Sequence, residues 1–229
     1  MIAAVGIWLG HSGAIAQEQS GSSSGSSGAA ASDPTSSVNS QDFKYRYFDL
    51  TTDSKEHIFE AGGSYAFNPR FKISHKLVGV HTNRTGTYET DFKELSLKPI
   101  LLTPGELFGV KAKYALGIEW LKDLGDVKDG TGAGSDKIAP LAGVAWVVSP
   151  QDTVITLAQY FHSYREEAGV SDVRQTGPRV IWLHSFPEIK GWLRVDWKGL
   201  IDHEAGNDFS STLELQLGKM IKPNFGLYG

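Results

Sequence analysis

The chain has 229 residues, a mass of 24.9 kDa, 40% hydrophobic residues and 21% charged residues, which is the composition of a folded protein. It contains no cysteine, and this excludes disulfides, Cys-ligated metal sites, thiol nucleophiles and a lipid-modified cysteine. The net charge of −4 argues against a nucleic-acid partner. The longest strictly apolar run after residue 10 has nine residues, 140–148, fewer than the roughly 18 to 20 of a membrane-spanning helix.

The first forty residues differ in composition from the rest. Residues 1–16 form an apolar stretch that ends in Ala14-Ile15-Ala16 before the polar Gln17, and this pattern predicts a secretory signal peptide cleaved after Ala16. A short buried helix is the alternative. Residues 17–40 are rich in Gly, Ser and Ala and predict a flexible tether. The folded domain is therefore expected to occupy residues 41–229.

From residue 41 onward the apolar residues alternate with a period of two, which is typical of β-strands. In 108–121, one face carries aromatic and aliphatic residues from Phe108 to Trp120, and the other carries Lys111, Lys113 and Glu119. We expect ten complete strands, with an eleventh beginning at Phe225. The other nine are expected to begin at Gln41, His57, Phe71, Thr87, Ile138, Thr153, Arg174, Trp192 and Phe209.

The connections between these strands fall into two alternating classes. Short turns are predicted around five prolines, because proline presets φ and has no N–H for a ladder: Pro69, Pro104, Pro150, Pro187 and Pro223. Longer polar loops are predicted between them, at 51–56, 83–86, 123–137, 166–173 and 203–208. The uneven spacing of the prolines predicts longer strands or a bulge between Phe71 and Leu102.

Strand length favours a membrane barrel over a soluble sandwich. Sandwich strands have about five to six residues, whereas a membrane-spanning strand needs about nine to eleven and carries aromatic residues near both interfaces. Many aromatic residues of this chain lie at strand ends. The prediction is an all-β, antiparallel, transmembrane up-and-down β-barrel of about 10–12 strands. A soluble, lipocalin-like barrel remains an alternative, because alternation alone does not say which face points inward.

The stretch from about Lys98 to Tyr228 resembles a family of bacterial outer-membrane β-barrels regarded as transporters, which includes proteins named after the meta-cleavage pathway of phenol degradation. The segments that carry the resemblance are 109–117, 132–140, 144–148, 156–164 and 213–229. The resemblance implies an outer-membrane barrel that passes small molecules, with hydrophobic molecules among the candidate solutes. Such barrels have even strand numbers and end on an aromatic residue, whereas this chain ends in Tyr228-Gly229. We therefore expect an incomplete barrel whose complete form has twelve strands.

No pattern of catalytic residues stands out. Barrel hydrolases place a His and a Ser two residues apart on one strand face, whereas His162-Ser163 and His184-Ser185 are adjacent and point to opposite faces. An omptin-like protease would use Asp202, His203 and Asp208. These residues lie in one predicted loop, and a solvated loop without a catalytic role is the favoured interpretation. We expect no enzyme activity.

No cofactor or metal site is predicted either. The acidic loop at 123–130 lacks the ligand spacing of a calcium loop, so a solvated loop tip is favoured over weak binding of calcium or of lipopolysaccharide-bridging cations.

The polar faces of the strands are the remaining candidate site. If these faces point inward, the following residues line the lumen: Lys72, Lys76, Lys111, Lys113, Glu119, Gln159, Arg165, Arg179, Arg194, Asp196, Lys198 and Glu214, with Gln216 beside them. Two interpretations stay open. The charges pair and fill a narrow bore, or they line a path that favours anionic or polar solutes.

The expected function is porin-like passage of small molecules across the outer membrane. A closed structural barrel, whose external loops contact lipopolysaccharide or partner proteins, is the alternative. The expected partners are membrane lipid, lipopolysaccharide, the outer-membrane assembly machinery and a small-molecule solute.

Overall fold

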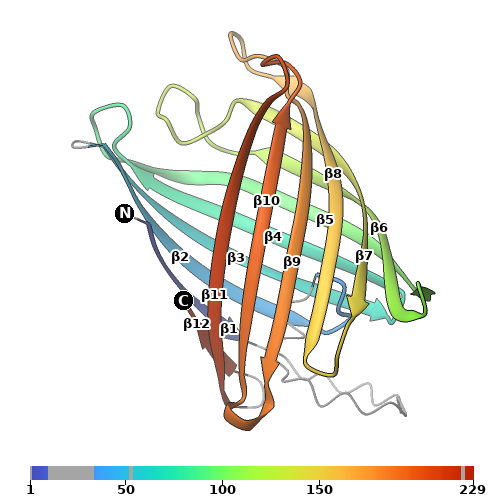
Figure 1. Cartoon of the computed structure of the whole chain (residues 1–229). Helices are drawn as coiled ribbons and strands as arrows, with labels where there is room; N and C mark the ends of the chain where they lie inside the picture. The colour runs from blue at the N-terminus through green and yellow to red at the C-terminus, as the bar shows by residue number, and fades with distance from the viewer. Residues whose placement is uncertain (1, 10–33, 52–53, 223–224) are drawn as a thin grey trace.

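The computed structural model describes residues 2–9, 34–51, 54–222 and 225–229. Within this part of the chain the fold is an all-β antiparallel barrel (Figure 1). The strands are β1 (Ile2–Leu9), β2 (Ser40–Thr51), β3 (Ser54–Asn68), β4 (Phe71–Thr82), β5 (Glu89–Leu107), β6 (Val110–Asp123), β7 (Ser135–Val147), β8 (Asp152–Glu166), β9 (Arg174–Phe186), β10 (Gly191–Asp202), β11 (Asp208–Lys222) and β12 (Phe225–Tyr228), and a 3₁₀ turn, η1 (Pro187–Ile189), joins β9 to β10.

The strands pair in an up-and-down order that closes on itself. Each strand from β2 to β11 pairs with its neighbours in the sequence, and β1 lies between β2 and β12. The short turns, such as those joining β7 to β8 and β9 to β10, lie at one end of the barrel, and the longer loops lie at the other (Figure 1). We call these the turn end and the loop end. The sequence prediction of an antiparallel barrel of 10–12 strands is confirmed.

Most predicted strand boundaries lie within three residues of the observed ones. The predicted turns at Pro69, Pro150 and Pro187 are confirmed, whereas the turn at Pro223 lies outside the described residues. The predicted irregularity between Phe71 and Leu102 is also confirmed. The register shifts between Val78 and Gly79, and β5 is the longest strand, with 19 residues.

The predicted turn at Pro104 is wrong, because this proline lies inside β5, opposite Lys113. The strand β4 begins at Phe71, opposite Leu101, so β5 has run past β4 before it reaches Pro104. A proline is tolerated at such an edge position, because its missing N–H faces no partner strand. The chain turns instead at Phe108 and Gly109, whose φ angles are 53° and 75°.

The conformation of this turn predicts a stabilising substitution. Two positive φ angles are typical of a type I′ hairpin turn, which favours Asn-Gly. A phenylalanine at the first of these positions is sterically unfavourable. Phe108→Asn is therefore expected to raise the free energy of unfolding by about 1 kcal/mol. Urea unfolding in detergent micelles measures the change, and an unchanged or lower unfolding midpoint would contradict it.

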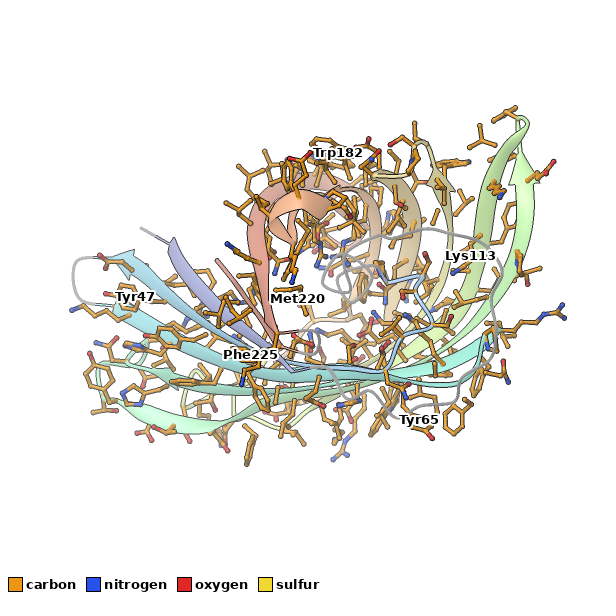
Figure 2. All side chains as sticks on the ribbon, turned by 90° about the horizontal axis from the view of Figure 1, so that it is seen from below. Tyr47, Tyr65, Lys113, Trp182, Met220 and Phe225 are labelled. Carbon is orange, nitrogen blue, oxygen red and sulfur yellow. The ribbon has the colours of Figure 1, made fainter. Side chains whose placement is uncertain are left out.

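The apolar faces of the strands point outward and many of the charged residues point inward. Leu213, Leu215 and Leu217 of β11 are 61 to 64% exposed, whereas Asp196 of the neighbouring strand is fully buried. Figure 2 looks along the barrel and shows Trp182 and Tyr65 outside the ring of strands and Lys113 and Met220 inside it. This arrangement is the reverse of a soluble protein, in which charged groups face water.

The inner face is not polar throughout. Apolar clusters also point inward, and they are formed by Ile100, Leu102 and Ala115, by Ala145, Ile155, Ile181 and Leu183, and by Trp192 and Met220. In the sequence these residues share strand faces with lysines and arginines, so alternation did not distinguish them from lumen-facing polar positions. They fill part of the bore between the charged groups.

The segment that precedes β2 also belongs to the barrel. Ile2–Leu9, which the sequence places in a signal peptide, forms β1; cleavage after Ala16 would remove this strand, and the signal peptide stays a prediction. The tether predicted for 17–40 lies outside the described residues up to residue 33. In its last part, Thr35 is 4% exposed and Ser40 begins β2. Among the described residues, no helix has the length and apolar character of a membrane span.

Candidate solute path in the barrel lumen

Four of the predicted lumen residues form one ion-pair cluster on adjacent strands. The Asp196 carboxylate accepts hydrogen bonds from Arg179 Nε at 2.8 Å and from Arg194 Nη2 at 2.7 Å, and Lys198 Nζ lies 3.7 Å away. The pairing register explains this proximity. Asp196 lies opposite Ile181 of β9, and Arg179 is two residues from Ile181 on the same strand face. Three cations surround one carboxylate, so this wall of the lumen carries excess positive charge.

The cluster continues across the closing strands to β2. Glu214 of β11 accepts hydrogen bonds from Lys198 Nζ at 2.9 Å and from Lys44 Nζ at 2.5 Å. The next inward residue of β2, Arg46, pairs with Glu60 of β3. The contributions of β2 were missed in the sequence. The alternation of Asp42, Lys44 and Arg46 with aromatic residues was a signal that could have identified them.

A second polar cluster lies on β5, β6 and β8. Glu119 is 6% exposed and accepts a hydrogen bond from Gln159 Nε2 at 2.5 Å. It also accepts one from the Ser96 hydroxyl, and Lys98 Nζ lies 2.7 Å from Glu119 Oε2. The predicted pair Glu119 and Gln159 is therefore brought together, whereas Ser96 and Lys98 were missed.

Two predicted lysines hold the segment before β2 inside the barrel. Lys72 Nζ of β4 donates to the Ser36 carbonyl at 2.8 Å, and Lys113 Nζ of β6 donates to the Thr35 carbonyl at 3.0 Å. Asn39 also accepts the Ala66 backbone N–H at 2.7 Å. We call residues 34–39 the lumen segment. It lies at the turn end of the bore, because Lys72 and Lys113 are near the turns that begin their strands.

The remaining predicted residues lie apart from these clusters. Lys76 pairs with Glu94 at 2.8 Å on the inner face. Lys111 is exposed near the turn end. The Arg165 side chain is 74% exposed and approaches Asp136 only to 4.0 Å at the loop end. Neither Lys111 nor Arg165 joins the ion-pair cluster, because both lie near the ends of their strands.

One cavity lies within the barrel, and a second lies in the wall between β2 and β11, where Leu213 and Leu215 of the outer face also line it. The turn-end cavity has a volume of about 260 Å³ and is lined by inward residues of β2, β3, β4 and β9–β12 and by the lumen segment. The loop-end cavity has a volume of about 490 Å³, and Lys44, Arg46 and Glu214 contribute to its wall. Gln216 and Tyr228 line both cavities, which therefore adjoin at these two residues.

The acidic groups at the loop end are engaged in structural contacts. Asp123 accepts the backbone N–H of Ala133 at 2.9 Å, and Asp136 accepts Lys122 Nζ at 2.7 Å. Glu56 lies 2.8 Å from Arg84 and 3.3 Å from Lys93. In the described ranges, no group of three or more His, Asp or Glu residues has the arrangement of a metal site. The Asp123 and Asp136 contacts hold the loop between β6 and β7, and the Glu56 contacts join β3 to β5 and to the loop between β4 and β5.

Two groups of aromatic side chains lie on the outer face, one near each end of the barrel, and we call them the two aromatic bands. At the loop end, Tyr45 OH lies 2.7 Å from His57 Nδ1, and Trp120 Nε1 donates to Tyr164 OH at 2.5 Å. At the turn end, Trp182 Nε1 donates to Asp152 at 3.0 Å. Other members of the turn-end band are Tyr65, Phe67, Phe71, His184 and Phe186, which contact one another or Trp182. Such amphipathic rings are typical of the two membrane interfaces.

The histidines do not form a hydrolase site with their neighbouring serines. Ser163 is 4% exposed and Ser185 is 6% exposed, whereas His162 is exposed and His184 Nδ1 lies 2.8 Å from Asp152. His203 contacts Thr176 at 2.8 Å and Asn207 at 2.8 Å, which are contacts within and beside one loop.

Comparison of the chain with family models, with curated proteins and with solved structures finds no match.

Proposed function

We propose that the protein is an outer-membrane β-barrel that passes small polar or anionic solutes through its lumen. The observation that carries the proposal is the reversed distribution of side chains, with leucines and aromatic rings outside and ion pairs inside. An apolar outer face is stable only in contact with lipid or detergent, and the strands of 12 to 19 residues between β2 and β11 exceed the roughly nine to eleven that cross a bilayer.

A soluble binding barrel is less consistent with this distribution. Such a barrel encloses an apolar cavity and presents its charges to water. The inner wall here carries Arg179, Arg194 and Asp196 in contact with one another, whereas β11 exposes a continuous row of leucines. The two aromatic bands support the same membrane position, with the short turns on the periplasmic side and the loops toward lipopolysaccharide.

A closed structural barrel is the second candidate, and the lumen segment favours it. The lysines of β4 and β6 hold this segment across the turn end, and the ion pairs occupy the bore above it. The two candidates differ in conductance. A protein reconstituted in a planar bilayer that gives no current steps above those of the bare bilayer would support the closed barrel.

The ion selectivity of the reconstituted barrel tests the path. Lys198 contacts Asp196 and Glu214, and its side chain is 39% exposed inside the lumen. Lys198→Glu changes the charge beside the path by two units, so the reversal potential in a salt gradient is expected to shift toward cation selectivity. The matched control is Lys128→Glu in the exposed loop after β6, which is expected to leave the reversal potential unchanged. Equal reversal potentials for the two variants would remove Lys198 from the path.

A further inference from the structure

The turn-end cavity has the walls of a binding site. Its lining includes two guanidinium groups, Arg179 and Arg194, and the ring of Trp192, together with Asp42 and Lys72. The lumen segment contributes Val38. The volume of about 260 Å³ is below the roughly 300 to 1,000 Å³ of sites for drug-sized ligands. The cavity therefore suits a molecule of only a few heavy atoms.

The charges around this cavity leave positive charge uncompensated. Arg179 and Arg194 share one carboxylate, that of Asp196. Glu60 of the cavity wall pairs with Arg46, and Lys76 pairs with Glu94. Asp42 is a second carboxylate near Arg194. The lining as a whole has four Lys or Arg side chains, Lys72, Lys76, Arg179 and Arg194, and two carboxylates, Asp42 and Glu60, so it attracts an anion.

Three buried polar atoms of the lining side chains have no hydrogen-bond partner among the described residues. They are Trp192 Nε1, Arg194 Nε and Gln216 Oε1. Trp192 is 1% exposed and Gln216 is 7% exposed, so bulk water does not satisfy these atoms. Buried polar groups without a partner are rare and carry a free-energy cost. Two of the three atoms are N–H donors, which suit the oxygens of an anion.

The position of the Trp192 ring depends on glycines opposite it. Trp192 lies opposite Gly218 in the register, and a Cβ atom at Gly218 would lie 2.2 Å from Trp192 Cζ2. The ring therefore occupies the space that a side chain at residue 218 would fill. Together with Tyr228 and Val38 it gives the cavity an apolar part beside its cationic part.

We propose that the turn-end cavity binds a small organic carboxylate, with the carboxylate against Arg194 and Trp192 Nε1 and its hydrocarbon part against the aromatic rings. The inference rests on the proposed function, because it names the solute class of the same lumen. A carboxylate is favoured over an inorganic anion because the cavity combines cations with an apolar wall. An organic cation is disfavoured by the two guanidinium groups.

Calorimetric titration of the detergent-solubilised, folded protein with sodium butyrate tests the assignment. Saturable binding of butyrate, with no binding of n-butylammonium and weaker binding of inorganic phosphate, is expected. Arg194→Gln removes one charged donor and is expected to weaken butyrate binding about tenfold. Trp192→Phe keeps a ring but removes the N–H, and is expected to weaken binding several-fold. The matched control, Arg165→Gln at the exposed loop end, is expected to bind like the unmodified protein.

Each outcome decides the assignment. Binding of n-butylammonium or phosphate as tight as that of butyrate would overturn it, as would unchanged binding in both lumen variants. If Arg194→Gln fails to fold, as shown by loss of its heat-modifiable gel mobility, Trp192→Phe carries the test. Butyrate binding without conductance would uphold the site and refute the solute path, whereas conductance without butyrate binding would do the reverse.

Discussion

Replacing Lys72 and Lys113 together by methionine is expected to raise the single-channel conductance several-fold. These lysines are the charged groups that bind the lumen segment, through the carbonyls of Ser36 and Thr35. Methionine has nearly the length of lysine but donates no hydrogen bond. Without these two bonds, the segment is held less firmly against β4 and β6 and keeps its contacts with β3 through Val38 and Asn39, and the turn end of the bore widens. Conductance rises with the cross-section of the narrowest part of a pore.

The control for this double variant is Lys111→Met. Lys111 is exposed near the same turn end, so this change removes one nearby charge without altering the contacts of the lumen segment. Its conductance is expected to equal that of the unmodified protein. A double variant that conducts like the unmodified protein would show that the lumen segment does not limit the current, and deletion of residues 35–39 would then also leave the current unchanged.

Asp196→Asn is expected to lower the free energy of unfolding by about 3 to 5 kcal/mol. The Asp196 carboxylate is fully buried and compensates Arg179, Arg194 and, at a greater distance, Lys198. The amide keeps the shape of the side chain but leaves these cations facing one another in a poorly solvated bore. Urea unfolding of the barrel in lipid vesicles, followed by heat-modifiable gel mobility, measures the loss.

Glu94→Gln is the matched control for this carboxylate. The Glu94 and Lys76 side chains are 25% and 38% exposed, so water screens the pair, and its loss is expected to cost about 0 to 1 kcal/mol. Equal unfolding midpoints for the two variants would contradict the assignment of Asp196 as the centre of the ion-pair cluster.

The architecture could be predicted because it depends on local patterns. Alternation with a period of two and alternating short and long connections are enough to place ten strands and their order. The pattern failed where a neighbouring strand decided the outcome. Pro104 is compatible with β5 only because β4 starts at Phe71 and leaves that edge without a partner, and no local signal in the sequence reports this.

The candidate site could be predicted only in part, for a similar reason. The parity of β9, β10 and β11 placed Arg179, Arg194, Asp196 and Glu214 among the candidate lumen residues, and the register brings these four together. The direction in which the charged face of each strand points was not predictable, because the alternation is the same whether that face points inward or outward. The lumen segment was missed because its contacts use backbone carbonyls, which every residue has. Its composition of small polar residues resembles that of a free linker.

The direction of the two faces is the central claim, and thiol labelling of β11 in lipid vesicles tests it most directly. The chain contains no cysteine, so single substitutions give no background. Cysteines introduced at Thr212 and Glu214 are expected to react with a water-soluble, membrane-impermeant maleimide, because both positions face the lumen. Cysteines introduced at Leu213 and Leu215 are expected to be protected by lipid. Labelling at the two leucine positions with protection at 212 and 214, or equal labelling at all four, would contradict the account.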